Sequence, residues 1–343
     1  MRCLVAGVLA LTLAAPGYAR TVAYRVSGGD NFSGIAVGGP LLVVADTRDG
    51  RAGIVSAYDG RTGGLRWTAQ APEPNDEDTF GIVVAASDRW AAVTSLPVVH
   101  VFDVEGNFVR TVRAPAGFHD DGFGERLAVD GDWLVVKQRL TYGPPPYGTR
   151  GVVHLYDVRS GMLRWTFAAG TTFARDLFPA ETYDFGDSLS LDGDRIYVSA
   201  PSAGVVCALD IPTGTDLWCV GSPSRFGGDR FGHALAASGN ALLVGAPGSH
   251  RLEFGNAYLV DARTGAVRRK YHGPGRGSRF GAAVAIHRNR LLVAAPGGRT
   301  YLLGRPSGRV LETFRPTLDL AFVGGRVALA ERRSDDAVVR VFD

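Results

Sequence analysis

The sequence predicts an all-β protein, a seven-bladed β-propeller of four-stranded antiparallel blades. Three observations support this fold class. A unit of about 40–50 residues recurs through nearly all of the 343-residue chain, and such a period is typical of propellers and solenoids. Each unit holds short apolar runs separated by Gly, Asn or Asp turns, as expected for strands joined by hairpins. The last unit ends one strand short, and an extra strand precedes the first unit, as a closed ring requires.

Each unit opens on a Phe-Gly pair or a variant of it. In chain order the openings are Phe32 with Ser33-Gly34, Phe80-Gly81, Phe123-Gly124, Phe185-Gly186, Phe231-Gly232, Phe280-Gly281 and the degenerate Leu318-Asp319-Leu320. Two strands joined by a tight turn are expected after each opening. The predicted turns are Gly38-Gly39, Ser87-Asp88, Gly131-Asp132, Gly193-Asp194, Gly239-Asn240, Arg288-Asn289 and Gly324-Gly325.

The third strand of most units ends in aspartate, and the fourth often carries tryptophan. The aspartates are Asp59, Asp103, Asp157, Asp210, Asp261 and Asp343, and the tryptophans are Trp67, Trp165 and Trp218. Because the seventh unit stops at its third strand, we expect residues 21–26 to supply the missing fourth strand. This N-terminal strand then closes the ring by pairing with the C-terminal blade, which removes exposed sheet edges.

Residues 1–19 have the pattern of a secretory signal peptide, with Arg2, an apolar run and small residues before Ala19. Residues 20–343 then form a single propeller domain. We expect an exported protein, periplasmic or secreted after cleavage near Ala19, with no transmembrane segment in the mature chain.

The cysteines support an oxidising compartment. Cys207 and Cys219 flank the Pro212-Thr213-Gly214 turn symmetrically, so an antiparallel hairpin centred there places them opposite one another, and we predict a disulfide. A pair of free buried thiols is the alternative.

Two repeat families are similar to this chain. Phe231-Gly232 with Gly245-Ala246-Pro247 resembles the FG-GAP repeat of integrin α-subunit propellers. The third and fourth strands, such as Tyr156-Asp157, Gly161 and Trp165, are similar to quinoprotein-type propeller repeats. The resemblance implies the fold but little about function. The calcium loops of the integrin relatives do not carry over, because two-residue turns stand in their place here. No metal and no cofactor are predicted.

An insertion in the third blade is the predicted binding site. Phe123 and Phe185 are 62 positions apart, against 43–49 for the neighbouring units. Part of the excess lies in residues 138–150, which hold Tyr142, Pro144, Pro145, Pro146 and Tyr147. Two tyrosines beside a stiff polyproline turn offer apolar contact area at a low entropic cost. A neutral surface insertion is the alternative.

The distribution of charge indicates one further candidate binding surface. The chain has 37 Lys and Arg against 34 Asp and Glu, which implies no obligatory polyanion partner. Residues 263–309 nevertheless contain eleven basic residues and no acidic one. This sector suits an anionic ligand, or it is an ordinary solvated face. No nucleic-acid motif accompanies it, so no specific nucleic-acid partner is expected.

The sequence therefore favours an exported, non-enzymatic scaffold that binds an envelope or extracellular protein or glycan through the loop face of blades 3 and 4. We expect a monomer. A quinoprotein-like oxidoreductase or propeller lyase is one alternative, and a calcium-dependent adhesion module is another.

Overall fold

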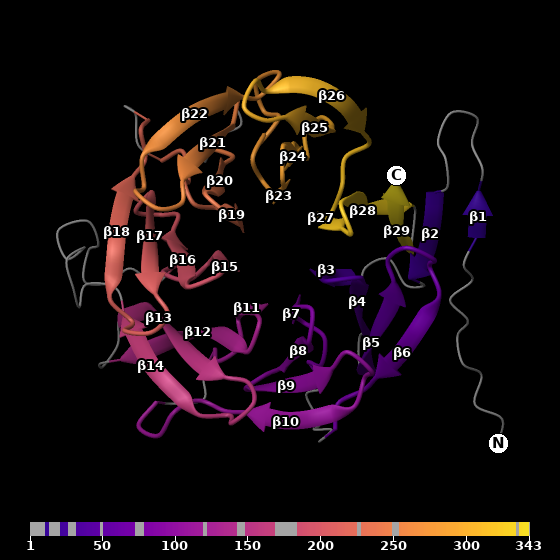
Figure 1. Cartoon of the computed structure of the whole chain (residues 1–343), viewed down its shortest axis with the longest axis vertical. Coiled ribbons are helices and arrows are strands. Elements are labelled where there is room, and N and C mark those ends of the chain that lie inside the picture. The colour runs from indigo at the N-terminus through magenta and orange to yellow at the C-terminus, as the bar shows by residue number, and fades with distance from the viewer. Residues whose placement is uncertain are drawn as a thin grey trace.

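Strands form seven antiparallel sheets around a central axis in the computed structural model of the chain (Figure 1). The structure describes residues 11–13, 21–26, 32–48, 51–72, 79–118, 122–142, 148–168, 184–224, 228–248, 254–333 and 336–342. These residues contain strands and turns but no helix, and hence no helix that could span a membrane. The predicted fold class, a seven-bladed propeller of four-stranded blades, is confirmed.

Blades 1 to 3 each place their first strand next to the axis and their fourth at the rim (Figure 1). Blade 1 comprises β3 (Phe32–Gly38), β4 (Leu41–Arg48), β5 (Arg51–Asp59) and β6 (Leu65–Ala69). Blade 2 comprises β7 (Val84–Ala86), β8 (Trp90–Ser95), β9 (Val98–Asp103) and β10 (Phe108–Val112). Blade 3 comprises β11 (Arg126–Asp130), β12 (Trp133–Tyr142), β13 (Gly148–Asp157) and β14 (Leu163–Ala168).

Blades 4 to 6 repeat the same order. Blade 4 comprises β15 (Leu189–Asp192), β16 (Arg195–Ala200), β17 (Val205–Asp210) and β18 (Asp216–Gly221). Blade 5 comprises β19 (Ala234–Ser238), β20 (Ala241–Ala246), β21 (Asn256–Asp261) and β22 (Val267–His272). Blade 6 comprises β23 (Val284–His287), β24 (Arg290–Ala294), β25 (Thr300–Gly304) and β26 (Arg309–Phe314).

Blade 7 closes the ring with strands from both ends of the chain. It comprises β27 (Asp319–Val323), β28 (Arg326–Arg333), β29 (Asp336–Phe342) and the N-terminal β2 (Thr21–Val26). Strand β2 pairs antiparallel with β29 from Val22↔Val341 to Val26↔Ala337, which confirms the predicted closure. A short strand, β1 (Leu11–Leu13), pairs with the outer edge of β2 and lies within the predicted signal peptide.

Five of the seven predicted turns between first and second strands are confirmed, and two were placed one residue too early. In blade 1 Gly38 pairs with Leu41, so the turn is Gly39-Pro40. In blade 2 the Ser87 amide donates to the Trp90 carbonyl at 2.8 Å, so the turn is Asp88-Arg89. The hydroxyl of Ser87 accepts hydrogen bonds from the amides of Arg89 and Trp90, which makes it the residue before the turn.

The core is divided between the blades. The seven clusters of buried apolar side chains each join one blade to the next around the ring. The opening phenylalanines fill these interfaces: Phe80, Phe123, Phe185 and Phe231 are fully buried and Phe280 is 3% exposed. Burying one such ring contributes roughly 1.5–3 kcal/mol. The motif recurs because each blade must seal the apolar gap to the blade before it.

The glycine after each phenylalanine is required by the backbone. Gly81, Gly124, Gly186, Gly232 and Gly281 have φ between 86° and 94°, a conformation that favours glycine. At Gly232 an added Cβ would lie 2.7 Å from the Cβ of Ser199, in the preceding blade. The Phe-Gly pair therefore combines an inter-blade anchor with a turn that brings two backbones close together.

The tryptophans of the fourth strands join neighbouring blades at the rim. Their indole Nε1 atoms donate to the carbonyl that follows the third strand of the next blade: Trp67 to Val104 at 3.0 Å, Trp165 to Ile211 at 2.8 Å and Trp218 to Ala262 at 3.2 Å. Each ring also covers a turn glycine of that next blade, namely Gly106, Gly214 and Gly265. The glycine that follows the aspartate of each of these third strands by three or four positions and the tryptophan of the preceding blade recur in the sequence because of this one contact.

The predicted disulfide is present. Cys207 of β17 lies directly opposite Cys219 of β18, with their Cα atoms 4.1 Å apart, and the two sulfur atoms are bonded. A bulge at Ala208 and Leu209 shifts the register nearer the turn without moving this pair.

Candidate interaction surfaces

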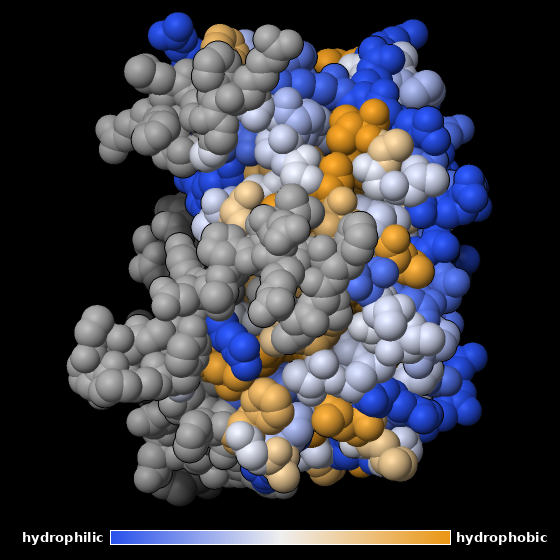
Figure 2. All heavy atoms as spheres, turned by 90° about the vertical axis from the view of Figure 1, so that its left-hand side faces the viewer, coloured by the Kyte–Doolittle hydropathy of each residue, from blue (hydrophilic) through white to orange (hydrophobic). Residues whose placement is uncertain are grey.

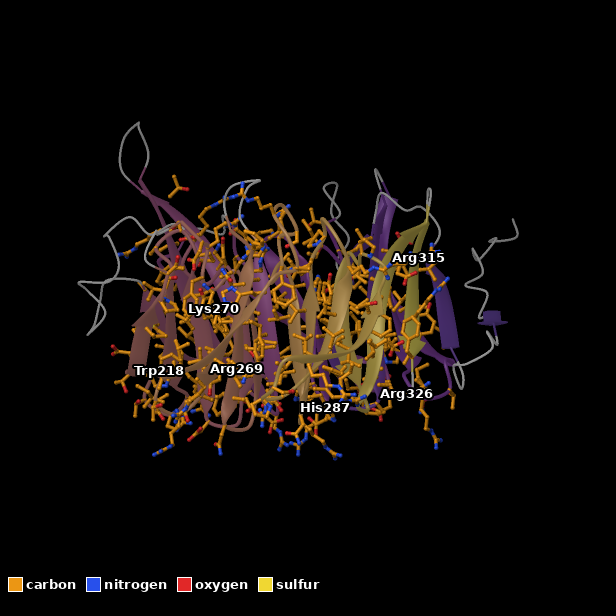
Figure 3. The ribbon with its side chains drawn as sticks, turned by 90° about the horizontal axis from the view of Figure 1, so that it is seen from above. Trp218, Arg269, Lys270, His287, Arg315 and Arg326 are labelled. Carbon is orange, nitrogen blue, oxygen red and sulfur yellow. A yellow bond between two sulfur atoms is a disulfide. The ribbon has the colours of Figure 1, made fainter. Side chains whose placement is uncertain are left out.

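The ring has two faces. We call the face that carries the joins between second and third strands the loop face. The opposite face, which carries the turns between first and second strands and between third and fourth strands, is the turn face. The loop face is uppermost in Figure 3, and the turn face, with His287 and Arg326, is at the bottom. Figure 2 shows that hydrophilic residues gather along the right-hand edge of the ring, which is the turn face.

The predicted binding residues belong to the loop face of blade 3. Tyr142 ends β12 and its backbone pairs with Gly148 of β13, whereas Pro144, Pro145, Pro146 and Tyr147 lie outside the described residues, as does the side chain of Tyr142. The hairpin that carries them is long: β12 and β13 have 10 residues each, against 5 or 6 for their counterparts in blades 2, 4, 5 and 6.

An ion-pair cluster around the buried Lys137 supports the base of this hairpin. The side chain of Lys137 in β12 is 5% exposed, and its Nζ lies 3.2 Å from Glu125 Oε2 and also pairs with Asp187 of blade 4. The guanidinium of Arg139 lies 3.0 Å from the other Glu125 oxygen. The cluster connects blades 3 and 4 beneath the predicted binding loop.

His154 lies in the same hairpin as a fully buried side chain with both ring nitrogens engaged. Its Nδ1 is 2.8 Å from the hydroxyl of Thr166, and its Nε2 is 2.9 Å from the amide oxygen of Gln138. Burial lowers the pKa of His154 to about 4, so the ring is neutral at pH 7. The cross-strand pair of His154 and Thr166 occupies the same register as the disulfide of blade 4, which points to a structural role.

Two cavities lie on the turn face. The first, which we call the paired cavity, has a volume of about 460 Å³ and lies at blades 2 to 4. Its charged lining is Asp88, Asp130, Asp132, Asp157, Arg89, Arg159 and Arg164. Asp132 accepts ion pairs from Arg89 at 3.3 Å and Arg159 at 2.9 Å, and Asp157 pairs with Arg164 at 2.9 Å. Each of the three guanidinium groups that line this cavity therefore has a carboxylate partner in the same lining.

The aspartates at the ends of the first strands interlock the blades. The backbone amide of Gly193 donates a hydrogen bond to Asp130, and that of Gly239 donates to Asp192. Burial raises the pKa of both carboxyl groups, and neighbouring carboxylates add to the effect. Within the described part of the chain, no three His, Cys, Asp or Glu side chains gather as metal ligands. These contacts give the Asp130-Gly131-Asp132 and Asp192-Gly193-Asp194 turns a structural role in joining blades 3 to 5.

The second cavity, which we call the basic cavity, has a volume of about 750 Å³ between blades 6 and 7. It is lined by His287, Arg288, Asn289, Arg290, Gly324, Gly325 and Arg326. None of these described lining residues is acidic. Burial, with Arg288 and Arg290 nearby, lowers the pKa of His287.

Backbone carbonyls and an aromatic ring position two of its guanidinium groups. Arg290 donates to the Gly325 carbonyl and lies 5.4 Å from the centroid of the Phe322 ring. Arg326 donates to the carbonyls of Gly60 and Arg61, both at 3.0 Å, and so reaches into blade 1.

A third concavity lies at the rim between β22 and blade 6. This outer groove, of about 360 Å³, combines apolar side chains such as Tyr271, Tyr301 and Val310 with the basic Arg269 and Lys270. Arg269 and Lys270 are labelled on this side of the ring in Figure 3. Of the basic residues in 263–309, Arg269 and Lys270 line the groove at the rim, and Arg288 and Arg290 line the basic cavity on the turn face.

Sequence reasoning named the basic sector but missed the basic cavity. The cavity joins the turn of blade 6 to that of blade 7, and Arg326 lies outside the acid-free run. The available signal was that Arg290 and Arg326 occupy the same position, the first residue of a second strand, in consecutive blades.

The fold, with a Trp-bearing fourth strand in three blades, defines the class of the protein: a propeller of the quinoprotein type. The family model described as outer membrane protein assembly factor BamB matches residues 51–313, and the chain belongs to this family. The quinoprotein-type part of the predicted resemblance is thereby confirmed, while the FG-GAP part remains a likeness of single motifs.

A solved structure shows the same architecture. The chain is similar to the crystal structure of BamB from Moraxella catarrhalis, with 15% identity, a TM-score of 0.52 and coverage of 98% of this chain and 96% of that chain. At this identity the likeness shows the fold alone. No curated protein sequence matches the chain.

Proposed function

We propose that the chain is an exported, non-enzymatic scaffold that binds protein partners during the assembly of outer membrane proteins. The observation that carries this proposal is the family match over residues 51–313. The disulfide between Cys207 and Cys219 supports an oxidising compartment outside the cytoplasm.

The binding surface in this proposal is the loop face of blades 3 and 4, with Tyr142, Pro144, Pro145, Pro146 and Tyr147 at its centre. The extended β12–β13 hairpin supports it, because paired strands hold a recognition loop at a fixed place. The ion pairs of Lys137 beneath the hairpin limit its movement relative to blade 4. A rigid support lowers the entropic cost of binding.

Export in this proposal depends on cleavage near Ala19. Removal of residues 1–19 would take away β1 and leave blade 7 with four strands, as in the other blades. N-terminal sequencing of the protein recovered from its host tests this point, and an intact N-terminus would contradict it.

The test of binding uses a variant in which residues 143–147 are replaced by Asn-Gly. The exchange keeps the Tyr142–Gly148 pair and spares Gln138, which contacts His154. Both forms are immobilised and offered solubilised envelope proteins, and the retained proteins are identified by mass spectrometry. We expect the unmodified protein to retain components of outer membrane protein assembly and the variant to lose them.

The matched control is Met162→Gln, which changes a 64% exposed side chain at the turn between the third and fourth strands of the same blade. Equal capture by all three forms would exclude the loop as the binding site. Capture of no assembly component by the unmodified protein would contradict the proposed function itself.

A further inference from the structure

We propose that the outer groove between blades 5 and 6 is a docking site for a partner protein, which inserts an aromatic side chain there with a carboxylate beside it. The groove lies at the rim of the ring, whereas the loop of the β12–β13 hairpin lies on the loop face of blade 3. This inference therefore does not rest on the proposed function.

The groove lies where other blades place a tryptophan. In blades 1, 3 and 4 the residue that follows the bulge of the fourth strand is Trp67, Trp165 and Trp218, respectively. Strand β22 of blade 5 has the same bulge, and its equivalent residue is Arg269, which pairs with Leu259. Trp218 and Arg269 are labelled at the same level of the ring in Figure 3. The exchange removes an indole ring from the contact between blades 5 and 6.

Tyr271 replaces only part of the missing indole. It covers Gly308, the turn glycine of blade 6, where an added Cβ would lie 2.7 Å from the tyrosine ring. Its hydroxyl donates to the Pro306 carbonyl at 3.2 Å. A groove of about 360 Å³ remains, lined by Tyr301 and by Val310, which is 50% exposed. Apolar recesses of this kind receive the aromatic anchors of protein partners.

The guanidinium group of Arg269 is available to such a partner. Arg110 is the equivalent residue of blade 2, and it donates to the Arg159 carbonyl and lies beside Gly161 of the next blade. Arg269 is exposed and lies 5.8 Å from the centroid of the Tyr271 ring. No described residue accepts a hydrogen bond from its guanidinium group or forms an ion pair with it, and none of the described lining residues is acidic. A guanidinium group binds a carboxylate through paired hydrogen bonds.

The other basic residues nearby define how much charge faces the groove. The ammonium group of Lys270 lies 5.5 Å from the centroid of the Tyr258 ring, which belongs to the interface of blades 4 and 5. Burial raises the pKa of Tyr271, and Arg269 and Arg305 act against this rise, so both guanidinium groups lie near the tyrosine. Two positive charges at the edge of an apolar recess complement an aromatic residue that has acidic neighbours.

The test measures binding of a labelled peptide, Gly-Asp-Trp-Asp-Ser-Gly, by fluorescence anisotropy at physiological ionic strength. Two matched peptides with the same label replace the tryptophan by alanine or both aspartates by asparagine. We expect saturable binding of the first peptide and at least tenfold weaker binding of each matched peptide, because the aromatic anchor and the charged hydrogen bonds both contribute. Equal binding of either matched peptide would overturn the proposal, as would the absence of saturable binding below about 1 mM.

Arg269→Trp restores the residue that the other blades have at this position. We expect it to fill the groove and abolish peptide binding without lowering the melting temperature, because an indole would again cover the rim of blade 6. Arg269→Gln leaves the groove open and removes the charge, so peptide binding should weaken about tenfold. Peptide binding that neither substitution changes would contradict the proposal.

The matched control is Arg268→Gln. Arg268 is the neighbouring residue of β22 and is also exposed, but it pairs with Asp261 at 2.8 Å. We expect unchanged peptide affinity, and an equal loss would show that general positive charge attracts the peptide, which would overturn the site. Sedimentation velocity tests a second copy of the chain as the occupant. A dimer that Arg269→Trp dissociates would assign the groove to self-association instead of a partner protein.

Discussion

The paired cavity and the basic cavity lie on the same face and are built from the same strand positions, yet they use charge differently. Trp133 of blade 3 pairs with Asp157, and Arg290 of blade 6 pairs with Gly304 at the equivalent position. The second turn residue is Asp132 in blade 3 and Asn289 in blade 6. Blade 6 therefore has Gly304 and Asn289 where blade 3 has Asp157 and Asp132.

The comparison shows that the same strand positions can join neighbouring blades in two ways. In blades 2 and 3, Asp132 accepts an ion pair from Arg89 of the blade before it. In blades 6 and 7, Arg290 and Arg326 donate instead to backbone carbonyls of the next blade in the ring. Substitutions of charged and buried polar residues test how the blades use charge, and the largest effect is expected at Lys137.

Lys137→Met should give the largest loss. It removes the buried cation that contacts both Glu125 and Asp187 at the interface of blades 3 and 4, and only Glu125 keeps a second cationic contact, to Arg139. We expect the free energy of unfolding to fall by roughly 2–4 kcal/mol, somewhat below the fully buried case because both carboxylates are partly exposed. Urea denaturation measures the change. Arg269→Met, at the exposed rim of blade 5, is the control, and an equal loss there would contradict the prediction.

Replacing His154 tests how a buried, neutral histidine affects the pH dependence of stability. The pKa of His154 is lowered to about 4 in the folded protein, against about 6.5 in an unfolded chain. Its contribution to stability is therefore complete above pH 6.5 and is lost as pH falls towards 4. The full effect is roughly 3 kcal/mol. We expect His154→Leu to flatten the pH dependence of the unfolding free energy between pH 7 and 4.5. An unchanged slope would show that His154 titrates normally.

A charge exchange between the two cavities should give the smallest effect. Asp132→Asn removes the carboxylate that neutralises Arg89 and Arg159, and Asn289→Asp places one in the basic cavity. We expect each change to alter the free energy of unfolding by no more than about 1 kcal/mol, because the arginines concerned are exposed. Urea denaturation compares both variants with the unmodified chain, and a loss of several kcal/mol in either variant would contradict the prediction.

The sequence alone determined the ring. Phe-Gly openings, two-residue turns and aspartate-terminated third strands are local features, and their repetition fixes the number of blades and the strand that closes them. The disulfide could also be predicted, because the register of one hairpin depends only on the residues between Cys207 and Cys219. The positions of the two misplaced turns depend on individual contacts that the repeat period does not specify. In blade 2 these are the hydrogen bonds of Ser87, and in blade 1 it is the pairing of Gly38 with Leu41.

How charges are shared between blades depends on the three-dimensional arrangement of the ring. Asp132 meets Arg89 from the blade before it, and Lys137 meets Asp187 from the blade after it. Arg326 joins Arg290 because the turns of blades 6 and 7 are neighbours in the ring. A sequence shows which charges exist. Whether a charge has a partner in a neighbouring blade depends on contacts between residues 35 or more positions apart, and the fold supplies those contacts.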